Sequence, residues 1–449
     1  MTERLDTIVI GAGIAGLTYA HARGDADLVV LEAAARPGGL ITTHRGDGWH
    51  VETGPEALQD NEPEVVALFD ELGLAVARAD EAARKRYILD TERHLVAVPS
   101  SPGEGLRWPL LSFGAKLRAA AGMFRRRDAD LTGSLADFVR GRFGPQLLEA
   151  VIDPVVSGIW AGDPELISFE AALPRVHDML TQHGSVVRAM KAAGRERRAR
   201  KEPRKPPPSL MSAQGGLDAL PHAIAAHLGD RLKLERPAER LTREGAGWRV
   251  EAGGQSYAAR RCVVALPAAA AARLFAQDQP ALSQSLGSIH SESVVSVAHI
   301  WKRDDLRHPL DAFGYLVPSR LQAMHLGTLF SSSIQPDRAQ AGSVVLRSLI
   351  GGARHPEMVE ASDEVLTSII CDEVGPLLGA RSGARPIGVH VTRWPHVLPR
   401  YDLDHPRRTA TIDGVLNERP GLAVIGNHRR GVAVNALVKA SRALAADHA

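Results

Sequence analysis

The chain has 449 residues, of which 44% are hydrophobic and 24% are charged, and its formal net charge is +2. This length predicts two or three domains, and the near-neutral charge gives no reason to expect nucleic acid or an acidic partner. The two cysteines, Cys262 and Cys371, stand in neither a metal-ligand nor a disulfide-framework spacing, which argues against a metal site and favours a reducing, cytoplasmic compartment. Because no signal-peptide pattern and no uninterrupted apolar run of about 18 residues occurs, we expect no membrane span.

Residues 7–32, TIVIGAGIAGLTYAHARGDADLVVLE, read as strand, glycine-rich turn, helix, strand and acid. The turn carries the GxGxxG glycines Gly11, Gly13 and Gly16. The first permits a tight turn, the second lets a pyrophosphate approach the main chain, and the third lets the helix pack on the strand. Glu32 closes the second strand, where an acid accepts hydrogen bonds from a ribose diol. We interpret the segment as a dinucleotide-binding motif.

The next segment, ARPGGLITTHRGDGWHVETGPEAL (35–58), indicates which dinucleotide is bound. Nicotinamide enzymes usually continue into another ordinary strand and helix at this point, and this chain does not. The segment resembles the extended FAD fingerprint of the amine oxidase superfamily, in which an arginine and a Gly-Gly pair wrap the pyrophosphate and the flavin edge. The matching positions are Arg36, Gly38, Gly39 and Thr42.

Residues 96–205 have helical, partly amphipathic patterns, and 290–390 contain strand-like runs that form a candidate substrate domain. The basic run RERRARKEPRKPPP (195–208) reads as a solvated linker; without interleaved aromatic residues it fits an anionic membrane surface better than nucleic acid.

Residues 420–445 again combine a strand, a glycine break at Gly426-Asn427 and a helix beginning near Ala433. Backbone N–H groups at such a helix start face an electron-rich acceptor, and the flavin ring offers one. We therefore expect both ends of the chain to meet on one ligand.

Taken together, further stretches resemble the protoporphyrinogen oxidase family of haem and chlorophyll synthesis, in family order and over essentially the whole chain. They are the Gly54-Pro55 pair, DPVVSGIWAGDP (153–164), QGGL (214–217), FGYLVPS (313–319), LGTLFSSSIQPDR (326–338), IGGAR (350–354), RWPHVLPRY (393–401) and IGNHRRGVAV (425–434).

This resemblance implies an α/β fold: a discontinuous Rossmann-type FAD-binding domain (1–95, 209–288 and 391–449), a helical domain of membrane-surface type (96–208) and a mixed-sheet substrate domain (289–390). It implies noncovalent FAD and no metal. The implied cofactor contacts are Gly11, Gly13, Ile14, Ala15, Gly16, Glu32, Ala33, Arg36, Gly38, Gly39, Leu40, Thr42, Gly54, Pro55, Ala238, Trp394, Gly426, Asn427, Val432, Ala433 and Val434.

The implied reaction removes six electrons from protoporphyrinogen IX, reduces the flavin three times and uses oxygen as acceptor, with hydrogen peroxide released. Hydride loss leaves a positive charge that the pyrrole nitrogens stabilise, so the protein's main task is to position the substrate. We therefore expect an apolar slot with cations at its mouth. Arg86 matches the arginine that pairs with a propionate, and Leu316, Leu329 and Leu349 match residues that sandwich the macrocycle. A solvated arginine and ordinary core leucines are the plainer readings of these residues.

Other activities stay open. One alternative substrate is coproporphyrinogen III, which carries four propionates and would bind better with extra cations around the pocket. Amine oxidation or carotenoid desaturation is less favoured, because the C-terminal FAD motif has no Tyr or Trp for an aromatic cage. Departures from the family pattern at Asp404 and Asn435 keep open a flavin-bound partner protein without turnover. A homodimer and peripheral membrane contact are further expectations.

Glu56 follows Gly54-Pro55, where relatives often carry an uncharged asparagine. Turned inward, its carboxylate could accept a bridge or pyrrole proton or stabilise a cationic intermediate. Turned outward, it is a solvated loop acid, and of the two orientations we expect the outward one.

Overall fold

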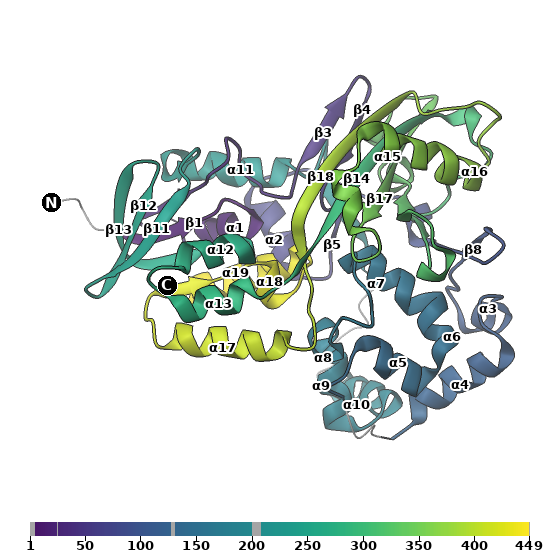
Figure 1. Ribbon diagram of the computed structural model, residues 1–449, viewed down its shortest axis with the longest axis horizontal. Coiled ribbons are helices and arrows are strands. Elements are labelled where there is room, and N and C mark those ends of the chain that lie inside the picture. The colour runs from purple at the N-terminus through teal and green to yellow at the C-terminus, as the bar shows by residue number, and fades with distance from the viewer. Residues whose placement is uncertain (1–4, 25, 127–130, 200–207, 449) are drawn as a thin grey trace.

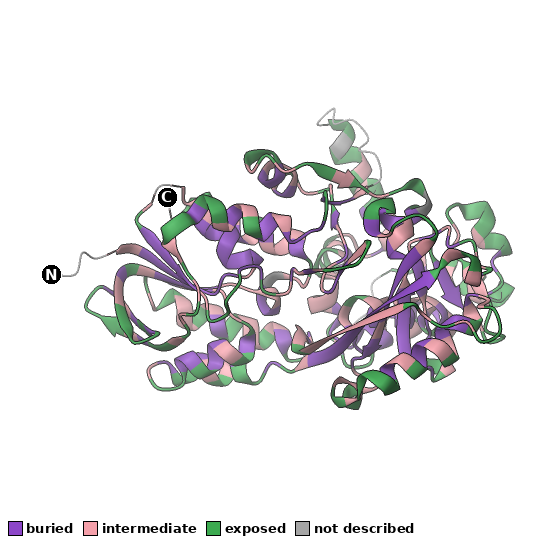
Figure 2. Cartoon of the chain, turned by 90° about the horizontal axis from the view of Figure 1, so that it is seen from above, coloured by how far each residue is buried: buried purple, intermediate pink, exposed green. Residues whose placement is uncertain are grey.

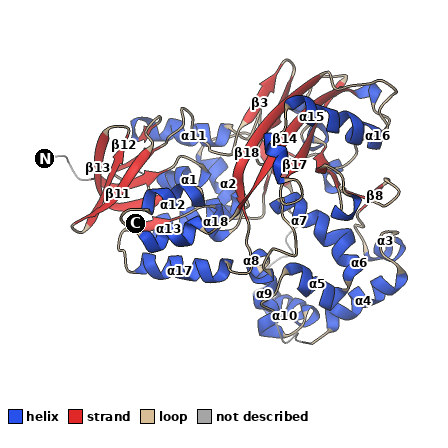
Figure 3. Cartoon of the chain, viewed as in Figure 1, coloured by secondary structure: helices blue, strands red, loops and turns tan. Residues whose placement is uncertain are grey.

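The computed structural model describes residues 5–24, 26–126, 131–199 and 208–448, and it places two large sheets and a helical region side by side (Figure 1). Figure 3 shows the helical region below the second sheet. The burial colours of Figure 2 show that buried residues follow the strands of both sheets and the inner sides of the helices packed on them.

The first sheet has the order β10-β2-β1-β13-β12-β11, with β19 paired to β13. Its central pairs are parallel, and only the β11–β12–β13 portion is antiparallel. The strands are β1 (Leu5–Ile10), β2 (Leu28–Leu31), β10 (Leu232–Lys233), β11 (Ala238–Glu244), β12 (Gly247–Ala252), β13 (Gln255–Val264) and β19 (Leu422–Val424). Strand β1 is buried on both faces: Val9 points into one core cluster, and Ile8 and Ile10 point into another. Apolar residues at consecutive positions are typical of such a parallel strand.

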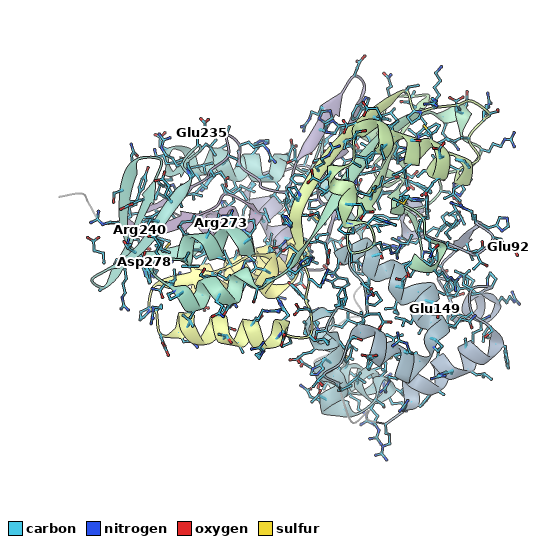
Figure 4. The ribbon with its side chains drawn as sticks, viewed as in Figure 1. Glu92, Glu149, Glu235, Arg240, Arg273 and Asp278 are labelled. Atoms are coloured by element: carbon cyan, nitrogen blue, oxygen red, sulfur yellow. The ribbon has the colours of Figure 1, made fainter. Side chains whose placement is uncertain are left out.

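Helices cover both faces of this sheet. On the face of Val9 lie α1 (Ile14–Ala22), α2 (Pro63–Glu71), α11 (Ala219–Leu228) and α19 (Val434–Asp447). On the other face lie α12 (Ala268–Phe275), α13 (Pro280–Gly287) and α17 (His405–Asn417). Arg240 of β11 is paired with Asp278, at 3.4 Å, and both are labelled in Figure 4. That pair joins the outer strands to the turn between α12 and α13.

The second sheet has the order β18-β14-β17-β16-β15-β7-β8 and is antiparallel except for the pair β7–β15. Its strands are β7 (Tyr87–Leu89), β8 (Leu95–Ala97), β14 (Ser291–Lys302), β15 (Gly314–Leu316), β16 (His325–Leu329), β17 (Ser343–Gly351) and β18 (Gly388–Pro399). One face packs against α15 (Asp363–Ile369), the π-helical turn Ile370–Val374 and α16 (Gly375–Leu377). The opposite face packs against α7 (Asp153–Trp160) of the helical region and against β4 (Trp49–Glu52), whose Val51 shares a cluster with Ala298, Ile300 and Val345.

Small sheets connect these parts. Strands β3 (Thr43–Gly46) and β4 (Trp49–Glu52) form a hairpin, and β5 (Leu58–Gln59), β9 (Leu210–Ala213) and β6 (Val76–Arg78) form a three-stranded sheet. The predicted domain boundaries stay predictions. Strand β7 pairs with the second sheet although it lies before the predicted boundary at residue 95, β8 crosses that boundary, and β18 crosses the one at residue 390.

The helical region has its own core, which includes Leu135, Val139, Val156 and Phe169. Its helices are α3 (Pro102–Arg107), α4 (Phe113–Phe124), α5 (Leu135–Phe143), α6 (Pro145–Leu147), α7 (Asp153–Trp160), α8 (Phe169–Ala172), α9 (Pro174–His183) and α10 (Val186–Ala199). Residues 195–199 of the predicted linker belong to α10, and 200–207 lie outside the described residues. A helix with the length and apolarity that a bilayer crossing demands does not occur in the described ranges.

Candidate functional site

The glycine-rich turn lies between β1 and α1. A Cβ on Gly11 (φ +102°) would lie 2.6 Å from the Ala265 carbonyl oxygen, and one on Gly16 would lie 2.1 Å from the Gly11 carbonyl oxygen. Both positions therefore require glycine. A Cβ on Gly13 would meet no described atom within 4 Å, and no described side chain caps α1 at Gly13. The helix start therefore offers backbone N–H groups beside open space, which suits a phosphate.

The Gly-Gly segment closes onto this turn. The Gly38 N–H donates to the Ala12 carbonyl at 2.8 Å, and a Cβ on Gly39 would lie 3.2 Å from the Gly13 Cα. Arg36 donates from Nη2 to the Gly39 carbonyl at 2.8 Å. The two motifs, separate in the sequence, therefore form one continuous backbone surface.

Glu32 is anchored at the end of β2. Its Oε2 accepts the Ala12 N–H at 2.6 Å and its Oε1 accepts the Ala34 N–H at 2.9 Å. Each carboxylate oxygen keeps a further lone pair for a ribose hydroxyl. The N–H groups of Glu235 (labelled in Figure 4) and Arg236 donate to the carbonyls of Ala34 and Glu32, which brings the segment leading to Ala238 alongside.

The Gly54-Pro55 segment packs against the Gly-Gly segment. A Cβ on Gly54 would lie 1.9 Å from the Leu40 carbonyl oxygen, and the Thr53 N–H donates to the Thr42 carbonyl at 2.9 Å. The buried Thr42 hydroxyl has no hydrogen-bond partner among the described residues. Trp394 of β18 donates from Nε1 to the Thr53 carbonyl at 2.7 Å, which ties the second sheet to this loop.

The C-terminal motif joins the same surface. Val434 and Val438 of α19 pack in one cluster with Ile14 and Leu17 of α1, so the two chain ends lie together, and their meeting on one ligand stays a prediction. Asn427 donates from Nδ2 to the Val397 carbonyl at 2.8 Å, next to Gly426 at φ +152°. The other predicted cofactor contacts lie on these same segments: Ile14, Ala15, Ala33, Leu40, Pro55, Val432 and Ala433.

The three predicted substrate leucines share one face of the second sheet. Leu316 and Leu349 are both register partners of Gly327, on either side of it, and Leu329 is the register partner of Arg347, two residues before Leu349. Directly opposed residues in a sheet point to the same side. All three leucines are half-buried. Leu316 also contacts α7, because a Cβ on Gly158 would lie 2.6 Å from the Leu316 Cδ2.

Arg86 lies at the edge of this face, just before β7. Its guanidinium carbon lies 5.1 Å from the centre of the Phe313 ring, and its Nη1 donates to the Arg84 carbonyl at 3.2 Å. Partial burial lowers its pKa. The side chain is otherwise exposed, and no ion pair with a described carboxylate occupies it. Its charge is therefore available to an anion.

Glu56 is buried, with only 6% of its surface exposed, so the expectation of an outward, solvated loop acid is wrong. Arg347 turns it inward: the Arg347 Nη2 lies 3.1 Å from the Glu56 Oε2, and its Nη1 donates to the carbonyls of Glu52 and Gly54 at 2.7 and 2.5 Å. Burial lowers the pKa of Arg347, and the carboxylates of Glu56 and Glu52 oppose that effect.

A second buried pair stands next to the first. Glu52 is fully buried and accepts hydrogen bonds from Arg338 Nη1 at 2.6 Å, Thr43 Oγ1 at 2.7 Å and the Leu217 N–H at 2.8 Å. Desolvation raises the pKa of Glu52, while Arg338 opposes that effect. Our reading of the sequence did not find these arginines. The sequence does contain a sign of Arg347, because SVVLRSLIG places an arginine inside an apolar strand pattern. A charge in such a strand is buried and needs a partner of opposite charge.

These residues fit a dinucleotide: the uncapped helix start beside open space suits a pyrophosphate, the anchored Glu32 suits a ribose, and the buried Thr42 hydroxyl has no partner among the described residues. The family model for flavin-containing amine oxidoreductases matches residues 14–446. A chloroplastic protoporphyrinogen oxidase from Nicotiana tabacum is 30% identical over 99% of this chain and 85% of its own length. The chain belongs to the protoporphyrinogen oxidase family of flavin-containing amine oxidoreductases.

A coproporphyrinogen III oxidase from Propionibacterium freudenreichii is similarly related, with 31% identity over 95% of this chain and 87% of its own length. Among solved structures, a protein from Exiguobacterium sp. 255-15 has a TM-score of 0.81 at 23% identity, with 100% of this chain and 99% of that chain covered. Cyclohexylamine oxidase from Brevibacterium oxydans has a TM-score of 0.71 at 16% identity, with 99% of both chains covered. The predicted α/β fold class with a Rossmann-type domain is confirmed, and the family makes this protein a flavin-dependent oxidoreductase.

Proposed function

We propose that this protein is an FAD-dependent oxidase that converts protoporphyrinogen IX to protoporphyrin IX in tetrapyrrole synthesis, with oxygen as the acceptor and noncovalent FAD as the cofactor. The observation that carries the proposal is the shared face of Leu316, Leu329 and Leu349. Arg86 lies at the edge of this face and forms no ion pair with a described carboxylate. An apolar face with a cation at its margin suits a flat, greasy macrocycle that bears carboxylates.

The protein's own residues supply position and charge. The leucines hold the macrocycle against the segment 52–56, and Trp394 and Arg347 fix that segment to the sheet. Arg86 pairs with a propionate and sets the rotation of the ring within the slot. Bound FAD supplies the two-electron acceptor. Because the pyrrole nitrogens stabilise the charge left by hydride loss, most of the rate comes from holding the reacting carbon in place.

Coproporphyrinogen III is the alternative substrate, supported by the Propionibacterium relative. Its two additional propionates need cationic partners in the pocket, which protoporphyrinogen IX does not need. Lys85, next to Arg86, already pairs with Asp311 at 2.7 Å, so this edge offers fewer free cations than its composition suggests. This favours protoporphyrinogen IX as the first substrate to test.

We further propose that this cytoplasmic enzyme contacts a membrane surface through its helical region. Phe113, Leu117 and Phe124 of α4 are exposed by 73%, 56% and 68%, and Lys116 and Arg118 lie on the same helix. Apolar side chains flanked by cations favour an anionic interface. Flotation with anionic but not with neutral vesicles, lost in a Phe113→Ser/Phe124→Ser variant, is the expected result; equal flotation of the variant contradicts it.

Purified protein assayed in air with each porphyrinogen tests the proposal directly. The expected result is a yellow protein and a rise in porphyrin fluorescence, with hydrogen peroxide formed alongside and a higher kcat/KM for protoporphyrinogen IX. A higher kcat/KM for coproporphyrinogen III would select the alternative. If the flavin-bound protein accelerates neither reaction over autoxidation, the proposal is contradicted, and the remaining role is that of a non-catalytic partner protein.

A further inference from the structure

The carboxylate of Glu56 is buried but has unused hydrogen-bond acceptors. Within the described part of the chain, neither of its oxygens accepts a hydrogen bond, although the side chain is only 5% exposed. Glu52, four residues earlier, is fully buried, and its carboxylate accepts hydrogen bonds from three donors of the protein. Arg347 balances the charge of Glu56 as an ion pair but donates no hydrogen bond to it. A buried carboxylate that accepts no hydrogen bond is costly, so the contrast indicates that a ligand supplies the hydrogen-bond donor for Glu56.

Arg347 fixes where this carboxylate lies. Its guanidinium holds the carbonyls of Glu52 and Gly54 through one nitrogen and lies 3.1 Å from the Glu56 Oε2 through another. The planar fork therefore ties the loop to strand β17 and restricts Glu56 to one position. Its positive charge also balances the buried negative charge of Glu56.

The pair lies beside the proposed substrate face. Arg347 is the register partner of Leu329 and precedes Leu349 by two residues, so its side chain leaves the sheet on the side of these leucines. Glu56 is held against that side. A macrocycle in the leucine slot would bring its central pyrrole N–H groups, which are hydrogen-bond donors, to this region.

We propose that Glu56 accepts the pyrrole N–H proton in each two-electron oxidation and that Arg347 positions it, an inference that rests on the proposed function. A methylene C–H bond breaks and its hydrogen passes with the electron pair to the oxidised flavin, which leaves a cation shared with the pyrrole nitrogen. In the same step the N–H bond breaks, its electron pair stays on nitrogen and neutralises the developing cation, and the proton passes to the Glu56 carboxylate, which releases it to solvent before the next oxidation. Three such steps remove three methylene hydrogens and three N–H protons, and the fourth methylene bridge then passes one proton to a pyrrole nitrogen, which completes the porphyrin. Dioxygen reoxidises the flavin and leaves as hydrogen peroxide, taking up the hydrogen from the flavin and one proton.

The test compares Glu56→Gln and Glu56→Asp with the wild type as FAD-loaded proteins. We expect Glu56→Gln to keep its flavin and to bind protoporphyrin IX within about threefold of the wild type, measured by fluorescence quenching. Anaerobic flavin reduction by protoporphyrinogen IX should slow by about 100-fold or more, as expected for loss of a general base, and Glu56→Asp should recover part of the rate. An unchanged reduction rate in Glu56→Gln overturns the proposal, and loss of flavin reassigns Glu56 to the cofactor and also overturns it.

Glu292→Gln is the control, because it breaks a buried ion pair outside the segment 52–56, in which the Arg400 Nη2 lies 2.6 Å from the Glu292 Oε1. It should lower the melting temperature and keep the reduction rate within about threefold. A loss of rate equal to that of Glu56→Gln would show a general effect of broken pairs and contradict the proposal. Should Glu56→Gln fail to fold, Glu56→Asp carries the test, since an unchanged rate with a displaced carboxylate contradicts proton transfer.

Arg347→Lys tests the positioning role. The charge stays, but the fork that reaches two carbonyls and a carboxylate is lost. The expected result is a larger solvent deuterium isotope effect on flavin reduction, because proton transfer to a displaced carboxylate becomes slower; an isotope effect equal to that of the wild type contradicts the role. If the wild-type flavin is reduced by neither porphyrinogen, the proposed function itself fails. If it is reduced and Glu56→Gln matches it, only the inference about Glu56 fails.

Discussion

The Cα of Gly13 lies 3.2 Å from the position that a Cβ on Gly39 would occupy, so two motifs that are separate in the sequence meet backbone to backbone. At Gly39 the main chain of Gly13 crowds a side chain, and the φ of +56° favours glycine. At Gly13 the space is open, and a side chain there would compete only with a ligand.

Gly13→Ala should therefore fold normally and bind FAD weakly. Gly13 has φ −69° and ψ 173°, which alanine adopts without strain. We expect the apoprotein to keep its melting temperature while the Kd for FAD rises by about tenfold or more. Gly141→Ala, inside α5 with equally open space, is the control and should leave the Kd for FAD unchanged, while the better helix propensity of alanine raises its melting temperature. An unchanged Kd for FAD in Gly13→Ala would remove the pyrophosphate from this turn.

The glycine motifs could be predicted from the sequence because their geometry is local. A strand, a GxGxxG turn and a closing acid determine one another within a few residues, and the structure joins them as expected. The position of Glu56 could not be predicted in this way. Its orientation depends on Arg347, which comes from a distant strand, and the local Gly-Pro-Glu pattern permits both orientations.

Arg86→Ala should weaken substrate binding more than turnover. The arginine has no carboxylate partner of its own among the described residues, and we assign it to a propionate at the edge of the slot. We expect KM for protoporphyrinogen IX to rise by about tenfold and kcat to change by less than about threefold. Arg84→Ala, two residues away and also exposed, should leave both constants unchanged. A KM that stays at the wild-type value would take Arg86 out of the site.

Asp153→Asn should loosen the contact between the helical region and the second sheet. The Asp153 Oδ2 accepts the Ser319 N–H at 2.7 Å and lies 3.3 Å from the Arg354 Nη2, and Arg354 donates to the Val317 carbonyl at 2.7 Å. We expect a loss of about 2 kcal/mol in stability, seen as a lower melting temperature. Asp178→Asn on α9, whose side chain is 67% exposed, is the control. Equal melting temperatures for both variants would contradict this account.

This cluster also explains why motifs spread along the sequence occur together. DPVVSGIWAGDP, FGYLVPS and IGGAR are far apart in the chain, and the structure packs them on one another through Asp153, Arg354 and the Ala161 carbonyl, which accepts the Ala353 N–H at 2.7 Å. Sequence patterns show that such segments are present, but their contacts form only when the helical region docks on the sheet. The pairing of β7 with β15 likewise could not be predicted from the sequence, because it forms only when distant segments come together in the fold.

Stability should fall in acid because three histidines are buried in their neutral form. Burial lowers the pKa of His299 and His428 to about 3 and that of His405 to about 4, from an ordinary value of 6.5. Between pH 6.5 and 4 the unfolded chain binds protons that the native protein does not bind. The stability contributed by each histidine is therefore complete above pH 6.5 and falls by up to about 1.4 kcal/mol per pH unit below it.

Melting temperatures measured from pH 8 to pH 5 test this prediction. His299→Gln should flatten the acid limb, because glutamine cannot take up the proton. The control His94→Gln changes a side chain that is 70% exposed and should leave the limb as it is. An acid limb with the same slope in His299→Gln and in the wild type would contradict the assignment.

Anaerobic mixing of the FAD-loaded protein with protoporphyrinogen IX, followed by admission of air, tests the central claim most directly. The account predicts that the oxidised flavin absorbance bleaches without oxygen and returns in air, with protoporphyrin fluorescence growing and three peroxide molecules formed for each porphyrin. A flavin that keeps its oxidised spectrum with both protoporphyrinogen IX and coproporphyrinogen III, together with fluorescence no faster than autoxidation, would contradict it.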